Sequence, residues 1–177
     1  MSDTTRFIFR SGPGPDRNGF KTDMEGWRLE AYKKNPVILF AHNDHALPIG
    51  RATAIGIENE QLVAEVEFAP TDQDQEVKKL VDQGFILGTS VGFRPIEFEF
   101  MRDEKHVFPI GIHSHVQELL ELSVVPIPAD SNALKSALGP EGPAYLKLAT
   151  EYNPALHAPT FDPIQLLTSL QNYLRSR

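Results

Sequence analysis

The 177-residue sequence contains no cysteine, and this absence removes several kinds of chemistry. Without a thiol the chain forms no disulfide, has no cysteine nucleophile and offers no thiolate ligand to a metal ion. The lack of cysteine also fits a reducing compartment. The chemistry of any active site must therefore come from other side chains.

Long apolar runs are absent as well. The N-terminus has no apolar segment of the signal-peptide type, and no stretch approaches the roughly 18 apolar residues that a membrane span needs. We therefore expect a cytosolic protein that does not bind a membrane.

Positive charge is scarce, because 17 lysines and arginines face 24 aspartates and glutamates, for a formal net charge of -7. This acidic balance argues against a surface that binds nucleic acid. Hydrophobic residues make up 41% and charged residues 23% of the chain, which is typical of a soluble globular protein. The length suits one domain with a full core and some additional tail.

Most of the regular pattern in the sequence is strand-like. Alternating or compact apolar runs predict strands at residues 6–10, 37–41, 85–100 and 116–125 and a hairpin at residues 49–57 and 61–68. Helices are predicted at residues 25–32, at 72–83 with Thr71 as its cap, near residue 132 with Asp130 or Ser131 as its cap, and at 164–173.

Strands rarely alternate with helices along the chain, which disfavours a doubly wound parallel sheet. We expect a mainly β fold with peripheral helices, built as a small closed β-barrel. The composition changes after Gly139-Pro140, so the predicted division is a domain at residues 1–138 and a tail at 139–177, with a proline-rich linker and a C-terminal helix.

Ser90 lies in the run Gly88-Thr89-Ser90-Val91-Gly92, which matches the G-x-S-x-G string of a nucleophile elbow. The context differs from an elbow, because the residues after Ser90 continue to alternate as in a strand instead of starting a helix. Gly88 and Gly92 lie on the same strand face as Ser90 and leave a side-chain gap on each side. A serine with such gaps would admit an extended peptide.

A serine hydroxyl becomes a good nucleophile when a base takes its proton, and histidine suits that task near pH 7. Among the six histidines, His42 has the most suggestive position. It ends an apolar strand, on the same alternating face as Ile38 and Phe40, so its ring would lie near the rim of the sheet. The alternative is that His42 is a structural or surface histidine.

Glu121 shares a strand face with Leu119, Ser123 and Val125, where an unpaired carboxylate is costly to bury. Two interpretations remain open: Glu121 orients a catalytic histidine, or this face is solvated.

Asp130, Ser131 and Asn132 offer backbone N–H groups suited to a developing oxyanion. The alternative for this loop is a rigid turn that only caps a helix.

Zinc is a minor alternative. His42-x-x-His45 and His113-x-His115 offer four imidazoles, but neither spacing is a strong metal signal, and the chain has no His-Glu-x-x-His motif. We therefore expect no metal and no cofactor. A zinc hydrolase would instead require bound metal.

Three blocks of sequence together resemble the prohead (capsid maturation) proteases of tailed phages. The blocks occur in the family's order over about residues 15–138 and comprise 16–19 with 26–27, 35–42 and 48–50; then 88–93; then 121–133. One departure is Asp130, where the family commonly has asparagine.

The resemblance implies a serine protease fold similar to the herpesvirus capsid proteases, a small β-barrel ringed by helices. It assigns the family's histidine to His42, its serine to Ser90 and its third member to Glu121. It also implies a serine endopeptidase that cleaves capsid-precursor or scaffold segments, and often itself, inside the procapsid in the bacterial cytoplasm.

The partner implied by the resemblance is the major capsid protein precursor or a scaffold, and a homodimer is compatible with it. The tail beyond residue 138 would be a targeting or self-cleaved segment. The alternative function is a non-catalytic capsid-assembly or scaffolding module on the same barrel.

Overall fold

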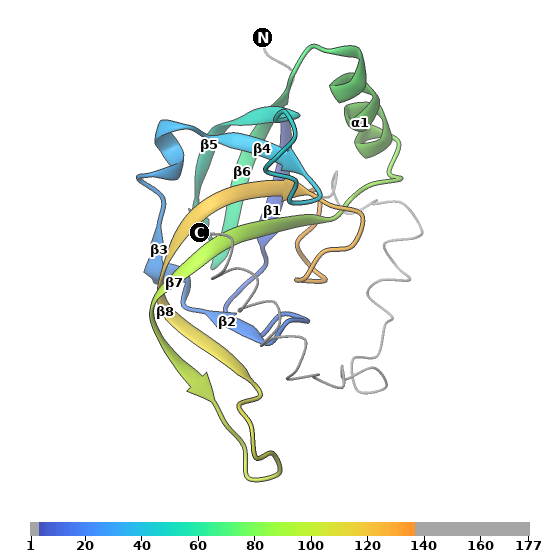
Figure 1. Cartoon of the computed structure of the whole chain (residues 1–177). Helices are drawn as coiled ribbons and strands as arrows, with labels where there is room; N and C mark the ends of the chain where they lie inside the picture. Colours follow the sequence, from blue (N-terminus) through green and yellow to red (C-terminus); the bar gives the residue numbers. More distant parts are fainter. Residues whose placement is uncertain (1–3, 137–177) are drawn as a thin grey trace.

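Strands dominate the part of the chain that the computed structural model describes, residues 4–136 (Figure 1). The strands are β1 (Thr5–Arg10), β2 (Phe20–Thr22), β3 (Trp27–Arg28), β4 (Val37–Phe40), β5 (Gly50–Glu58), β6 (Gln61–Phe68), β7 (Thr89–Met101) and β8 (Gly111–Val124). The helical elements are the 3-10 turns η1 (Met24–Gly26) and η2 (Tyr32–Lys34) and the helix α1 (Asp72–Asp82).

The strands form one eight-stranded sheet that curls into a half-barrel (Figure 1). Its order is β1-β6-β5-β4-β8-β2, and β3 and β7 also pair with β8. The long strand β8 runs parallel to β2, β3 and β4 and antiparallel to β7. It therefore joins segments that lie between residues 20 and 101. The mainly β character expected from the sequence is confirmed.

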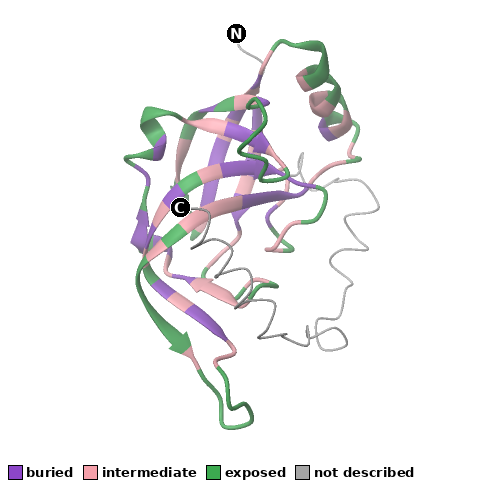
Figure 2. Cartoon of the chain, in the orientation of Figure 1, coloured by how far each residue is buried: buried purple, intermediate pink, exposed green. Residues whose placement is uncertain are grey.

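The core lies inside the curl of the sheet, and the far halves of β7 and β8 extend away from it (Figure 2). Phe7 and Phe9 of β1, Leu62 of β6 and Leu122 of β8 are fully or almost fully buried. Each such side chain contributes roughly 1.5–3 kcal/mol through removal from water. The outer end of β7 is different, because Phe98 and Phe100 remain about half exposed.

Two local predictions are confirmed. The hairpin forms as β5 and β6, with Glu58 opposite Gln61 at the turn. The helix α1 begins after Thr71, whose hydroxyl oxygen accepts a hydrogen bond from the Asp74 amide, and Gly84 follows it with a φ of 81°. A left-handed φ of this kind favours glycine, which explains why the helix ends there.

The helix predicted at residues 25–32 is wrong. Two 3-10 turns flank the short strand β3 instead, and Trp27 pairs with Gln117 of β8. Gly26 permits this approach, because a Cβ at that position would lie 1.9 Å from the His115 carbonyl oxygen. Pairing with β8 therefore overrides the local helical preference.

The helix predicted near residue 132 is also wrong. The Ala133 amide donates to the Asp130 carbonyl in a turn, and the next residues bridge two strands: Leu134 pairs with Gly88 and Lys135 with Phe7. The predicted helix at 164–173 and the whole predicted tail at 139–177 lie outside the described residues. Between residues 4 and 136, no helix is long and apolar enough to cross a membrane.

Candidate active site

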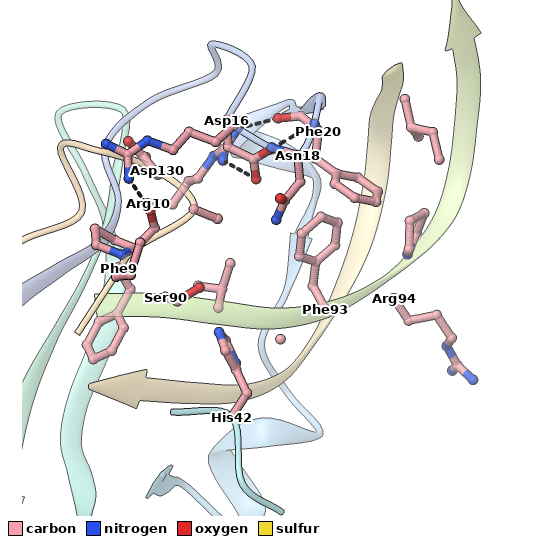
Figure 3. Close-up of a pocket in the computed structure, with 18 of the residues that line it drawn as sticks. Phe9, Arg10, Asp16, Asn18, Phe20, His42, Ser90, Phe93, Arg94 and Asp130 are labelled. Atoms are coloured by element: carbon pink, nitrogen blue, oxygen red, sulfur yellow. Dashed lines mark hydrogen bonds and ion pairs between the residues drawn. The ribbon is translucent and has the colours of Figure 1, made fainter. Parts of the chain in front are cut away.

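A cavity of about 840 Å³ opens beside Ser90 (Figure 3). Its walls come from β7, from the end of β1 with the loop that follows, and from residues 127–130. The apolar lining side chains are Phe9, Phe20, Val91, Phe93, Phe98, Ile112 and Ile127. Ser90 and His42 both line this cavity, so the structure brings these two predicted residues to one site.

His42 reaches the cavity from a strained turn. The strand β4 ends at Phe40, and Ala41 and His42 then adopt left-handed φ values of 54° and 59°. Non-glycine residues in such conformations cost of order 1–3 kcal/mol each. The expectation that His42 continues the alternating face of Ile38 and Phe40 is therefore wrong, because the turn and not the strand directs the ring toward Ser90 (Figure 3).

Glu121 holds the His42 ring. The distance from His42 Nδ1 to Glu121 Oε1 is 2.6 Å. Because a carboxylate only accepts hydrogen bonds, Nδ1 must carry the proton in this contact. In the neutral ring Nε2 then presents a lone pair, which is the form required of a general base.

Ser123 stabilises the contact between His42 and Glu121 through two hydrogen bonds. Its hydroxyl donates to Glu121 Oε2 at 2.6 Å, and its oxygen accepts from the His42 backbone amide at 3.2 Å. Ser123 is fully buried and lies directly opposite Ser90 in the β7–β8 ladder. In the sequence, Ser123 stands out only because it shares a strand face with Glu121. Their i, i+2 spacing on one strand is the signal that indicates the contact between them.

The charge of Glu121 also affects the pKa of the buried Tyr32 hydroxyl. Burial raises the pKa of the Tyr32 hydroxyl, and the negative charge of Glu121 raises it further. The Tyr32 hydroxyl donates to the Val37 carbonyl at 2.9 Å, immediately before the buried part of β4. Tyr32 therefore stays neutral and anchors the segment that leads to His42.

The gaps beside Ser90 have a different purpose from the one expected. A Cβ at Gly92 would lie 2.4 Å from Glu121 Oε1 and 2.8 Å from its Cγ. A Cβ at Gly88 would lie 2.7 Å from the Val125 carbonyl oxygen and 2.9 Å from Pro128 Cδ. Glu121 fills the gap at Gly92, and Val125 and Pro128 fill the gap at Gly88. The expectation that these gaps admit a peptide is therefore wrong.

Ser90 is nearly buried at the start of β7. Within residues 4–136 its hydroxyl makes no hydrogen bond, and the His42 ring points toward it in Figure 3. Hydrogen bonds between a nucleophile and its base are often long in free enzymes and shorten when substrate binds.

Asp130 organises the loop that faces Ser90. Its carboxylate accepts from the Ser11 amide at 2.7 Å, from the Ser11 hydroxyl at 2.9 Å and from the Asn132 amide at 3.0 Å. The Asn132 amide is thus already occupied, and Ser131 and Asn132 line a neighbouring cavity of about 320 Å³ instead. Of the three predicted loop residues, the structure brings only Asp130 to the cavity beside Ser90.

A buried ion pair fixes the opposite wall. Arg10 Nη1 lies 3.2 Å from Asp16 Oδ2, and both side chains are almost fully buried. Burial raises the pKa of Asp16, although backbone amides of Phe20 and Asn18 and the charge of Arg10 act in the other direction. Arg10 Nη2 also donates to the Phe20 carbonyl at 2.8 Å, so this pair shapes the loop 11–20. No pattern in the sequence indicates this pair.

The four-histidine zinc site, the minor alternative from the sequence, does not form. His45 lies exposed beside Asp44, at 3.6 Å, whereas His113 and His115 pair with Asp23 at the other end of β8. His42 is held by Glu121. The four imidazoles considered for zinc therefore divide between separate places.

Residues 28–138 match the family of caudovirus prohead serine proteases. The chain belongs to this family, as its sequence blocks indicated, although the match begins after residues 16–27. Membership makes the protein a serine peptidase of phage capsid maturation that works with capsid precursor proteins in the procapsid. Searches of curated proteins and of solved structures found no significant match.

Proposed function

We propose that the chain is a serine endopeptidase in which Ser90 is the nucleophile, His42 the general base and Glu121 the orienting carboxylate. The observation that carries this proposal is the 2.6 Å contact between His42 Nδ1 and Glu121 Oε1 beside the cavity that Ser90 lines. The contact leaves Nε2 free to take the hydroxyl proton.

The chemistry follows from these positions. Ser90 Oγ attacks the scissile carbonyl carbon while His42 Nε2 accepts the hydroxyl proton. His42 then protonates the leaving amine as the C–N bond breaks, which leaves an acyl-enzyme ester. A water molecule, deprotonated by His42, hydrolyses the ester and restores Ser90.

Backbone amides in the Asp130 loop are our candidates for the oxyanion site. Among the described residues, the amides of Ala129 and Asp130 donate to no group, although both residues line the cavity. The Ala129 carbonyl accepts from the Arg17 amide at 3.0 Å, which fixes the peptide planes nearby. Fixed N–H donors beside a developing oxyanion are worth several kcal/mol in the transition state.

The substrate would bind as an added strand. Within residues 4–136, β7 pairs along its length with β8 alone, and its first amide, that of Thr89, donates to the Ala133 carbonyl at 2.9 Å, so the edge of β7 beyond Thr89 is open to an extended peptide. The apolar lining of the cavity favours apolar side chains near the scissile bond. The proposed substrates are scaffold or capsid-precursor segments, and segments of the chain itself.

We also propose that the half-barrel is closed in the manner of the herpesvirus capsid proteases. The Ile8 amide donates to the Leu134 carbonyl at 2.9 Å, and the Lys135 amide donates to the Leu87 carbonyl at 2.8 Å. These bonds support a link between β1 and the start of β7 through residues 134–135. They also join residues 134–135 to the protease domain that we propose at residues 1–138, before the proposed tail at 139–177.

The test uses a serine-directed phosphonate and a co-expressed capsid precursor. The wild-type chain is expected to be labelled once, at Ser90, and to cleave the precursor. Ser90→Ala and His42→Ala should lose both properties while their circular dichroism stays unchanged. His45→Ala is the matched control, because this exposed histidine lies in the same turn and should keep full labelling.

Cleavage that persists in a folded Ser90→Ala chain would contradict the assignment. A wild-type chain that binds the precursor but neither cleaves it nor reacts with the phosphonate would favour the non-catalytic assembly module instead. Mass spectrometry of the products identifies the cleavage sites.

A further inference from the structure

A second group of histidines and carboxylates lies on the outer part of β8, which we call the Asp23 cluster. It consists of Asp23, Glu99, His113 and His115. The distance from Asp23 Oδ1 to His113 Nε2 is 2.7 Å, and from Asp23 Oδ2 to His115 Nδ1 it is 2.8 Å. His113 lies ten residues from Ser123 along β8, or roughly 30 Å of extended strand, so this cluster is separate from the candidate active site.

Each of the four ring nitrogens in the Asp23 cluster faces a carboxylate oxygen. On the far side of the rings, Glu99 Oε1 lies 3.5 Å from His113 Nδ1 and 3.7 Å from His115 Nε2. A neutral imidazole has one N–H and one lone pair, so two neutral rings supply two donors for four nitrogen–oxygen contacts. With both rings neutral, the other two contacts set lone pairs against negative oxygens, and no positive charge balances the two carboxylates.

A divalent cation resolves this imbalance. With the ion on the Asp23 side, both rings stay neutral and direct their remaining N–H groups at Glu99. The charges of the ion and of the two carboxylates then cancel. Metal-bound histidines commonly donate their second N–H to a carboxylate in this way, which fixes the ring orientation.

We propose that Asp23, His113 and His115 form a binding site for a divalent transition-metal ion, with zinc the best match. Two imidazoles and a carboxylate are typical zinc ligands, and water would complete a tetrahedron. The candidate ligand atoms all lie within 4.8 Å of one another. Zinc bonds of about 2.0–2.1 Å place tetrahedral ligand atoms about 3.3 Å apart, so small side-chain shifts suffice.

The backbone around the site is already fixed. The Asp23 amide donates to the Ser114 carbonyl at 2.9 Å, and Gln117 Nε2 donates to the Asp23 carbonyl at 2.8 Å. Lys21 lies beside His113 in the β2–β8 register, and its positive charge opposes metal binding.

The ion would tie the segment between β2 and η1 to β8, at the base of the exposed outer half of the β7–β8 pair. Its role would then be to stabilise this part of the molecule, because a ligand that binds the folded state alone stabilises it. This inference concerns a metal site and does not depend on the proposed mechanism.

The experiment is a calorimetric titration of the full, tag-free chain with zinc chloride at pH 7.5, after removal of metal with a chelator. We expect one zinc ion per chain and a rise in the unfolding temperature. His115→Ala should weaken binding by at least about 100-fold, and Glu99→Gln by roughly 10- to 100-fold, because it perturbs ring orientation. Substitution with cobalt should give the intense visible absorption of a tetrahedral site, absent from His115→Ala.

The matched control is His106→Ala. His106 Nδ1 lies 2.7 Å from Asp103 Oδ1, as close as the contacts in the Asp23 cluster, but this pair belongs to no three-ligand group within residues 4–136. Zinc affinity should be unchanged in this variant. The proposal is overturned if the wild-type chain binds no stoichiometric zinc, or if folded His115→Ala and Glu99→Gln both bind it with wild-type affinity.

Discussion

Two histidine–carboxylate clusters lie on the same strand, one at each end of β8, and they differ in how the carboxylate is shared. At the inner end, one oxygen of Glu121 contacts His42 and the other accepts from Ser123. At the outer end, the two oxygens of Asp23 contact two different imidazoles. The nitrogen–oxygen distances, 2.6 Å at the inner end and 2.7 and 2.8 Å at the outer end, are too similar to distinguish the two clusters.

The difference lies in what remains free. The single ring at the inner end keeps Nε2 available beside Ser90, as a proton acceptor needs. The rings at the outer end have carboxylates on both sides, as suits a bound cation. A carboxylate on one side of the inner ring, against carboxylates on both sides of the outer rings, therefore distinguishes the proposed site for proton transfer from the proposed metal site.

The largest expected effect comes from Glu121→Gln. Loss of the carboxylate removes the preference for the Nδ1-protonated ring, and the amide can donate to Nδ1 instead, so kcat/KM should fall by roughly 10³- to 10⁴-fold. Peptide cleavage kinetics measure this effect. Asp103→Asn is the control: its pair with His106 is equally short but exposed, and activity should stay within about twofold. Equal losses in the two variants would erase the distinction between the inner cluster and an ordinary surface pair.

Gly92→Ala should have the next largest effect. The new methyl group would meet the Glu121 carboxylate at 2.4 Å, so the carboxylate must move away from His42. We expect a loss of kcat/KM of about 100-fold and a destabilisation of about 1–3 kcal/mol.

Gly56→Ala is the matched control for Gly92→Ala, because nothing lies within 4 Å of a Cβ at that position. It should fold with unchanged activity. Wild-type kinetics in Gly92→Ala would show that the position of the Glu121 carboxylate is unimportant.

A smaller effect is expected for Ser123→Ala. The substitution removes one hydrogen bond to Glu121 and the acceptor for the His42 amide, but it leaves the contact between ring and carboxylate in place. The free energy of unfolding should fall by about 1–2 kcal/mol, and kcat should fall about tenfold with little change in KM. Ser123→Thr should restore much of the loss, whereas a purely structural role would leave kcat unchanged in both variants.

The smallest effect concerns the pH dependence of stability. Hydrogen bonds from His113 and His115 lower the pKa of Asp23 below its ordinary value of 3.8. A carboxyl group with a lowered pKa stabilises the folded state above its unfolded value, and this contribution is lost as pH falls through the folded value. The stability difference between the wild-type chain and Asp23→Asn should therefore shrink below about pH 4.

Urea unfolding between pH 3 and 6 measures this difference. Asp16→Asn should act with the opposite sign, because burial raises the pKa of Asp16 and the contribution is lost as pH rises. The same slope in both variants would refute the difference between the two environments.

Local patterns in the sequence predicted the hairpin, α1 and the strand character around Ser90, because each depends on periodicity, capping and turn residues that lie close together. The two wrong helices share a cause. Residues 25–32 and 131–135 have weak local preferences, and pairing with distant strands decides their conformation. Such pairings are invisible in a single sequence.

The sequence predicted which residues form the candidate site but not how they are arranged. The strand faces and the family resemblance predict His42, Ser90 and Glu121 as site residues. The left-handed turn at Ala41 and His42 has no signal in the sequence. The glycines on either side of Ser90 were identified, but their purpose was not, since the groups that fill the gaps come from Glu121 and Pro128. The structural role of each glycine therefore depends on the remote segment that packs against it.

The position of β8 near the end of the described chain has a consequence for biosynthesis. His42 and Glu121 are separated by 79 residues, and β4 can pair with β8 only after β8 has left the ribosome. Contacts between segments so far apart form late, because a long loop must close first. A nascent chain that ends before β8 therefore lacks the carboxylate that holds His42, and on the proposed assignment it remains inactive until β8 has been synthesised.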